Sequence, residues 1–210
     1  MRHRDGPTSD LHELRLELVA RAIAATGARS VLDLGCGDGE LLARLATVEH
    51  VERLVGIDVS PGAVREARAL LGLGPWGGAA DERVVVRQAS FTEPDPSLAG
   101  FDLAVMLETI EHIDPARLGA VERTVFTCWR PRIVLVTTPN HEYNVVYGVP
   151  PGAFRDPDHR FEWTRERFRR WAAGVAARAG YHVVHDGIGH PVPLRGAPTQ
   201  MATFTIRGGT

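Results

Sequence analysis

Short apolar runs alternate along the chain with segments whose apolar residues recur at helical spacing. The runs are too short for helices and are rich in Val, Ile and Leu, which predicts buried strands. We expect strands over residues 30–34, 54–59, 83–88, 102–106 and 133–137. Strands that alternate with helices are typical of a parallel sheet covered on both faces, so the fold class is α/β.

The segments that flank these strands predict helices and one loop. Residues 1–29 hold an amphipathic lead-in helix, in which Asp10 and Glu13 have the spacing of a capping box. Asp114, followed by proline, opens a further helix with apolar residues on one face. The glycines and proline within residues 72–81 predict a surface loop.

The C-terminal third departs from this alternation. Residues 139–163 lack periodicity and crowd Pro, Gly, Asn and aromatic residues together, which indicates a functional insert after the fifth strand. Thr164 has the sequence context of a helix cap. Residues 181–185 and 201–206 read as two closing strands that pair antiparallel at a sheet edge. We therefore expect a single domain over residues 1–210.

Composition excludes several classes of protein. Hydrophobic residues make up 44% of 210 residues, which supplies a substantial core for one domain. No apolar run has membrane-spanning length, the N-terminus lacks an apolar secretory segment, and two cysteines form no disulfide framework. We expect a cytoplasmic protein without a membrane partner. The net charge of −2 gives no global basic footprint, so any RNA contact must be local.

A glycine-rich turn follows the first predicted strand. Gly35 and Gly37 would let a ligand approach the backbone at the carboxyl end of the strand, where open α/β sheets bind ligands. Asp58, at the end of the second strand, is placed to accept hydrogen bonds from ribose hydroxyls. These features alone leave NAD-dependent enzymes and methyltransferases open. Asp33 favours the second class, because a carboxylate there repels pyrophosphate and suits the ammonium group of S-adenosylmethionine.

This stretch resembles the first motif of class I S-adenosylmethionine-dependent methyltransferases. The resemblance implies a doubly wound, mostly parallel sheet of seven strands. It also implies that Asp33, Gly35 and Gly37 line the methionine end of the cofactor and that Asp58 holds the ribose. Residues after the third strand would line the adenine; they include Ser90 and Phe91.

Glu108, Glu111 and His112 follow the fourth predicted strand. If a helical turn begins where the strand ends, positions i, i+3 and i+4 share one face, so two carboxylates and an imidazole would converge. The alternative is a solvated helix start, because acidic residues favour a first turn. Other methyltransferases show a similar motif, so the cluster alone does not separate a metal site from scaffold.

Two runs in and after the insert, residues 138–144 and 154–172, resemble the Hen1 family of small-RNA 3′-terminal 2′-O-methyltransferases. The most specific part is the Asp-His-Arg-Phe-Glu-Trp-Thr-Arg core, in which the histidine is His159. The resemblance implies that His159 joins the three residues of the cluster as the fourth protein ligand of a catalytic divalent metal, which is manganese in this family. Two carboxylates and two imidazoles also suit other transition metals such as cobalt. Arg15 would help to hold the cofactor carboxylate.

An RNA 3′ end with free 2′ and 3′ hydroxyls is the substrate that the resemblance implies. A vicinal diol is a natural bidentate chelate, so a 2′-deoxy end or a 3′-phosphate should not be methylated. Arginines around the insert supply local positive charge, and aromatic rings stack on single-stranded bases. The candidate RNA-binding residues are Tyr143, Asn144, Arg155 and Arg160.

Two alternatives remain open at this point. The chain could be a small-molecule O-methyltransferase acting on a vicinal diol, or a non-catalytic subunit that binds RNA or cofactor. Bacterial Hen1 relatives generally carry a further N-terminal domain and act with a polynucleotide kinase-phosphatase in RNA repair. The 210 residues leave no room for that domain, so we expect this partner only if the native protein is longer.

Overall fold

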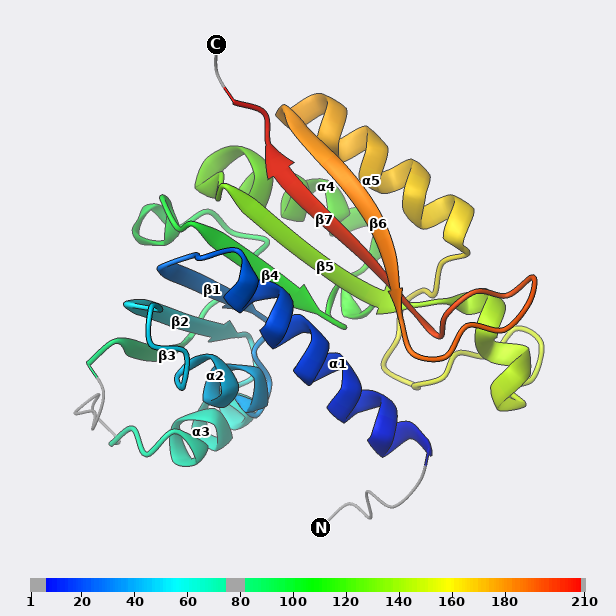
Figure 1. Cartoon of the computed structure of the whole chain (residues 1–210), viewed down its shortest axis with the longest axis horizontal. Coiled ribbons are helices and arrows are strands. Elements are labelled where there is room, and N and C mark those ends of the chain that lie inside the picture. The colour runs from blue at the N-terminus through cyan, green and yellow to red at the C-terminus, as the bar shows by residue number, and fades with distance from the viewer. Residues whose placement is uncertain (1–6, 75–81, 209–210) are drawn as a thin grey trace.

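A seven-stranded sheet forms the centre of the computed structural model, which describes residues 7–74 and 82–208 (Figure 1). The strand order is β3-β2-β1-β4-β5-β7-β6. The first five strands are parallel, and β7 lies antiparallel between β5 and β6. This confirms the predicted doubly wound, mostly parallel sheet with an antiparallel edge. The strands are β1 Ser30–Leu34, β2 Arg53–Asp58, β3 Val84–Gln88, β4 Leu103–Leu107, β5 Ile133–Pro139, β6 Tyr181–Ile188 and β7 Thr199–Ile206.

Helices cover both faces of the sheet. In Figure 1, α1 crosses in front of the strands while α4 and α5 lie behind them. The front layer buries apolar side chains of α1, α2 and α3 in one core, and the back layer forms a second core with α4, η4 and α5. The helices are α1 Pro7–Ala25, α2 Glu40–Leu45, α3 Pro61–Leu70, α4 Leu118–Val121, η4 Glu122–Trp129 and α5 Arg165–Ala179. Short 3-10 helices complete the chain: η1 Pro96–Leu98, η2 Ile110–His112, η3 Pro115–Arg117 and η5 His141–Tyr147.

The predicted start of the first helix is wrong. The helix begins at Pro7, so Asp10 lies in its first turn and does not cap it. Proline fits the first helical position because the amide hydrogen that it lacks would be unpaired there. The helix buries Leu16 and Val19 against the sheet, while Leu18 is exposed.

The helix predicted to open at Asp114 has the predicted buried face but a different winding. Leu118, Val121 and Val125 are buried. The chain nevertheless passes from a 3-10 turn through α4 into the wider π-helix η4, which ends where Arg130 adopts a left-handed conformation. Apolar spacing identifies the buried face, but it fits all of these windings.

Of the predicted loop 72–81, residues 75–81 lie outside the described residues.

The predicted start of α5 and the two predicted closing strands are confirmed. Thr164 caps α5 and its side chain accepts a hydrogen bond from the Arg167 amide. The two closing strands pair over their full lengths, with Tyr181 opposite Ile206. Within the described residues, no helix combines the length and the apolar character needed to span a bilayer.

Candidate active site

A sharp turn follows β4, and it determines where the acidic residues point. Glu108 has a φ of 52°, in the left-handed region that residues other than glycine rarely adopt. Its amide donates to the Thr137 hydroxyl at 3.0 Å, which holds the turn against β5. The η2 turn then starts at Ile110. The prediction that Glu108, Glu111 and His112 share one face of a helical turn is therefore wrong, because Glu108 lies outside any helix.

The structure nevertheless brings Glu111, His112 and His159 together. One ligand atom from each lies within 4.8 Å of the others, and the two imidazole rings are 4.9 Å apart. The backbone amide of Arg160 donates to the Glu111 carbonyl at 2.7 Å, which fastens the insert to η2. This is the one group of three or more such side chains that the described part of the chain brings close enough to share a cation.

The cluster has the donor chemistry of a metal site. Glu111 is fully buried; its Oε2 accepts from the Thr138 hydroxyl at 2.9 Å, while its Oε1 has no hydrogen-bond partner among the described residues. Burial and then the charge of Glu108 raise the pKa of Glu111 well above its usual value. Burial and then His159 lower the pKa of His112, which favours the neutral imidazole that binds metals. A divalent cation would neutralise the buried charge of Glu111 and would bind the neutral imidazole of His112. These residues therefore fit a divalent cation.

Glu108, the remaining predicted ligand, lies in the same cavity but is paired with Arg15. The two side chains meet at 3.0 Å, and Arg15 also donates to the Thr199 hydroxyl at 2.7 Å. Glu108 Oε1 is buried without a hydrogen-bond partner in the described chain, so one carboxylate oxygen is left for another ligand. Arg15 is therefore a largely buried residue with two partners rather than an exposed arginine on the helix surface. The structure places it beside Glu108 in the cavity that contains the cluster.

Sequence analysis missed Glu162, which orients His159. The His159 Nδ1 lies 2.6 Å from Glu162 Oε1, so Nε2 is the ring nitrogen left for a metal. The carboxylate also accepts from the Asn144 side chain and from the Arg155 amide. Burial raises the pKa of Glu162, but these hydrogen bonds outweigh it and the pKa is lowered overall. The spacing His-x-x-Glu was visible in the sequence, but it did not reveal this contact.

We expect Glu162→Ala to weaken Mn²⁺ binding by roughly 10- to 100-fold, the usual effect of removing a group that orients a ligand histidine. Electron paramagnetic resonance titration without RNA or cofactor measures this affinity directly. Glu166→Ala is the matched control, since Glu166 is an exposed acid on the adjacent helix and pairs with Arg170. Equal affinities for the two variants would contradict the orienting role.

The glycine turn after β1 adjoins the cluster. A Cβ added at Gly35 would lie 2.4 Å from the Thr109 side chain, and Thr109 directly precedes η2. Gly37 has a positive φ and open space on its Cα, and its amide donates to Asp58 at 3.1 Å. The turn thus leaves room for a ligand while packing against the segment that carries Glu111. This arrangement fits the cofactor position predicted for the turn.

The remaining predicted cofactor residues differ in exposure. Asp33 is buried at the end of β1, and burial followed by the charge of Asp58 raises its pKa to about 7. A cationic ligand would favour its charged form, as expected for the ammonium group of S-adenosylmethionine. Ser90 binds the Thr92 hydroxyl at 2.7 Å, while the Phe91 ring is buried in the back core.

The raised pKa of Asp33 predicts a pH-dependent stability effect. The folded chain holds the Asp33 proton up to about pH 7, whereas the unfolded chain releases it near pH 4. Stability is therefore lost as the pH rises through this window. We expect Asp33→Asn to raise the melting temperature of the cofactor-free protein at pH 8 and to change it little near pH 4. Asp186→Asn, at an exposed position, should show no such difference in thermal scans at the two pH values.

Comparison with known proteins identifies the family. A family model described as "Methyltransferase domain" matches residues 32–132. The small RNA 2′-O-methyltransferase of Mus musculus is 34% identical over 95% of this chain and 52% of its own length. The crystal structure of the methyltransferase domain of bacterial CtHen1 is 39% identical with a TM-score of 0.84, and the match covers 94% of this chain and all of that domain. The chain belongs to the Hen1 methyltransferase family.

The likeness to Hen1 extends over the domain rather than over whole relatives. The chain spans about half the length of the curated relatives that it matches first. A solved structure described as the Pnkp1/Rnl/Hen1 RNA repair complex matches with a TM-score of 0.66 at 22% identity, over 93% of this chain and 41% of that chain. At that identity it bears on the fold alone.

The predicted RNA-binding residues of this Hen1 domain are largely engaged within the protein. Tyr143 is buried and its hydroxyl donates to the His190 carbonyl at 3.0 Å. Asn144 is buried and bound to Glu162, and the half-buried Arg155 donates to Asn144 at 2.6 Å. Arg160 alone among the four has an exposed side chain. These contacts give Tyr143, Asn144 and Arg155 a bracing role within the protein.

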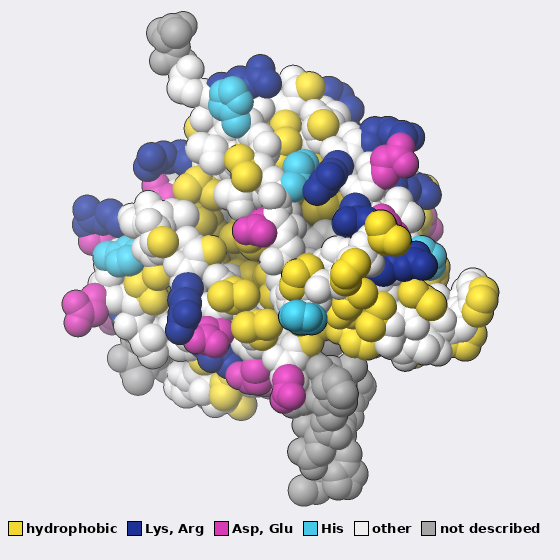
Figure 2. Space-filling model, turned by 45° about the vertical axis from the view of Figure 1, so that its right-hand side comes forward, with side chains coloured by type: hydrophobic (Ala, Val, Ile, Leu, Met, Phe, Trp, Pro, Cys, Tyr) yellow, Lys and Arg dark blue, Asp and Glu magenta, His cyan; other side chains and the backbone are white. Residues whose placement is uncertain are grey.

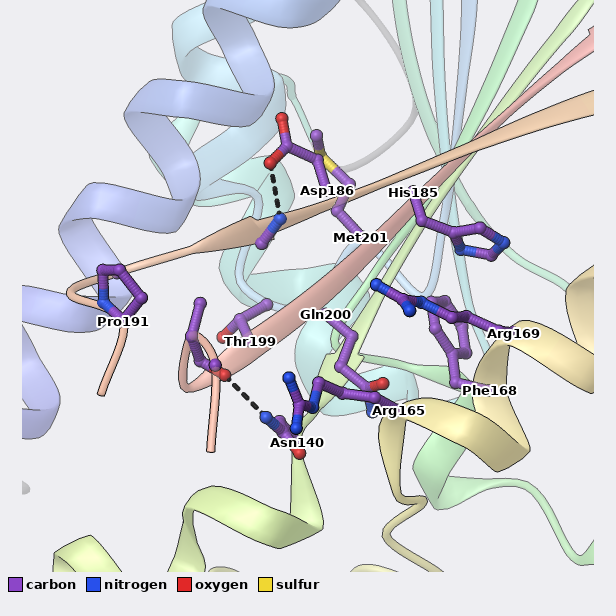
Figure 3. Close-up of a pocket in the computed structure, with 14 residues that line it drawn as sticks. Asn140, Arg165, Phe168, Arg169, His185, Asp186, Pro191, Thr199, Gln200 and Met201 are labelled. Carbon is purple, nitrogen blue, oxygen red and sulfur yellow. Dashed lines mark hydrogen bonds between the residues drawn. The ribbon is translucent and has the colours of Figure 1, made fainter. Parts of the chain in front are cut away.

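The Glu111–His112–His159 cluster opens into a cavity of about 580 Å³. A second cavity, of about 360 Å³, lies between α5, β6 and β7 (Figure 3). Arg165 and Arg169 extend into it from α5, and Gln200 faces them from β7. Arg165 is already paired with Glu142 at 2.7 Å. The first cavity is therefore the candidate active site, because it holds the convergent ionisable groups.

Proposed function

We propose that this domain transfers a methyl group from S-adenosylmethionine to the 2′ oxygen of the 3′-terminal nucleotide of RNA. The observation that carries the proposal is the junction at Thr109, where the cofactor turn at Gly35 packs against the segment that bears Glu111 and His112. A methyl donor held by this turn would lie next to the segment that carries the metal-type cluster. Family membership supplies the substrate class, since the curated relatives are named small RNA 2′-O-methyltransferases.

The chemical step is a substitution at the methyl carbon. The bond between sulfur and the methyl carbon breaks, the new bond to the 2′ oxygen forms, and the electron pair of the broken bond neutralises the sulfonium. The hydroxyl proton is released, and no residue is assigned as the base. Asp33 and Asp58 would position the donor, while the β4–η2 turn would position the ribose.

Glu108, Glu111, His112 and His159 would hold a divalent metal, for which we propose manganese. The metal supplies Lewis-acid chemistry that makes a neighbouring hydroxyl more acidic. Mixed carboxylate and imidazole donors suit manganese, cobalt or iron better than magnesium, which prefers oxygen ligands and water. To bind the metal, the Glu108 carboxylate would give up its ion pair with Arg15.

Methyl transfer to matched RNA oligonucleotides tests the proposal. We expect labelling of an RNA with a 2′,3′-diol end and background labelling of the same RNA with a 2′-deoxy or 3′-phosphate end. Equal labelling of the diol and 2′-deoxy ends would contradict 2′ methylation. Faster methylation of free catechols or ribonucleosides would favour the small-molecule alternative, and no turnover with any acceptor would favour a binding subunit.

A repair partnership is a separate proposal. The resemblance to bacterial Hen1 suggests a polynucleotide kinase-phosphatase as partner, because that enzyme class can remove the 3′-phosphate that blocks a diol end. Co-purification of the full-length protein with such an enzyme from the native cell would test it. A kinase-phosphatase absent from the purified complex would contradict it.

A further inference from the structure

Tyr147 is an aromatic residue of the candidate active site that the sequence analysis did not select. It ends η5 and lines the cavity that holds the Glu111–His112–His159 cluster. Its exposed fraction is 37%, against 6% for Tyr143, the ring that we predicted to contact RNA. Gly148 follows in a left-handed conformation and stops the helix, which fixes Tyr147 at the cavity rim.

Two neighbouring side chains hold the Tyr147 ring in place. The Arg155 guanidinium lies over the ring at 5.0 Å from its centroid, and the Tyr143 ring packs against it at 5.1 Å with a tilt of 55°. Arg155 is itself held by the carbonyl oxygens of Pro198 and Asn140. These contacts hold the ring in place, and the 37% of its surface that stays exposed leaves area for a further contact.

The surroundings of Tyr147 suit a flat apolar group. Leu11 and Val149 line the same cavity, whose volume of about 580 Å³ can hold a nucleoside. Figure 2 shows hydrophobic side chains gathered on the right of the face in view. Figure 1 places the insert on the same side of the molecule. The base of a nucleotide whose ribose is bound at the cluster would lie close to this apolar lining, because the base joins the ribose one carbon from the 2′ position.

We propose that Tyr147 is the stacking platform for the 3′-terminal nucleobase of the RNA. The inference rests on the proposed function and adds a base-binding subsite to it. An aromatic face accepts every base, so the subsite should favour the presence of a base without reading its identity. Base stacking on an aromatic ring contributes about 1–3 kcal/mol, which corresponds to roughly a 5- to 150-fold preference.

The test compares two RNAs that both keep the terminal diol, one with a normal 3′-terminal nucleotide and one with an abasic terminal ribose. For the unchanged protein we expect kcat/KM to be roughly 5- to 150-fold higher with the base present. Tyr147→Leu should remove this preference, so that kcat/KM falls more on the RNA that carries the terminal base than on the abasic RNA. Tyr147→Phe should retain it, because the aromatic face remains. Val145→Ala, an exposed neighbour on η5, is the control and should behave as the unchanged protein.

Other outcomes separate the possible roles of the ring. A Tyr147→Leu protein that still prefers the base would overturn the inference, and so would an unchanged protein that methylates both RNAs equally well. A weaker S-adenosylmethionine affinity in Tyr147→Leu, measured by calorimetry without RNA, would assign the ring to the cofactor instead. If the unchanged protein methylates neither RNA, the proposed function fails rather than the subsite alone.

Discussion

Glu111→Gln should lower kcat/KM for RNA methylation by about 10²–10³-fold, the magnitude associated with losing one preorganised electrostatic group. The amide keeps a similar volume and an oxygen for the Thr138 hydroxyl, so the β4–η2 turn should persist. It loses the negative charge that would attract a divalent cation. His159→Ala should have an effect of similar size, because it removes an imidazole from the opposite side of the cluster.

The change in stability should run opposite to the change in activity. Glu111 is a fully buried carboxylate beside Glu108, with one oxygen unpaired among the described residues, so its charge costs folding free energy when no metal is bound. Glu111→Gln should therefore melt at the same temperature as the unchanged metal-free protein or higher. Glu166→Gln serves as the control for both measurements. Full activity in Glu111→Gln would remove Glu111 from the metal site.

Much of the fold follows from the pattern of apolar residues. Strands β1 to β5 were predicted within two residues at each end, because short runs rich in Val, Ile and Leu between helical segments fit few other structures. The closing strands β6 and β7 were predicted shorter than they are, since Asp186, Gly187 and Gln200 at the missed ends interrupt the apolar pattern. Local pattern thus identifies the sheet but not the full extent of its edge.

The site was harder to predict because its geometry depends on contacts between distant segments. The left-handed conformation of Glu108 is held by Thr137 on the next strand, and no spacing rule predicts it for a glutamate. The same limit applies to the insert. Tyr143 and Tyr147 both lie on η5, yet the first hydroxyl reaches the backbone of His190, which buries that ring and leaves the other at the cavity.

Arg155→Ala should destabilise the domain by about 3 kcal/mol, because it strands acceptors in the protein interior. The guanidinium donates to the Pro198 carbonyl at 2.8 Å, to the Asn140 carbonyl and to the Asn144 side chain, and so ties the insert to the segment before β7. For a chain of this size the loss corresponds to a fall of about 6–12 °C in melting temperature. Arg155→Lys should recover only part of it, since an ammonium cannot reproduce the planar fork.

Arg160→Ala is the matched control, because Arg160 was predicted to bind RNA on the same grounds but has an exposed side chain. The free energy of unfolding of Arg160→Ala should differ from that of the unchanged protein by no more than about 0.5 kcal/mol, as for an ordinary surface substitution. Its melting temperature should therefore change little. If Arg160 contacts phosphate, its loss should weaken RNA binding and lessen the dependence of binding on salt. Thermal scans and RNA titrations at two salt concentrations separate the two arginines. A thermally unaffected Arg155→Ala protein with weaker RNA binding would show that Arg155 serves the RNA directly and that the insert is held by its other contacts.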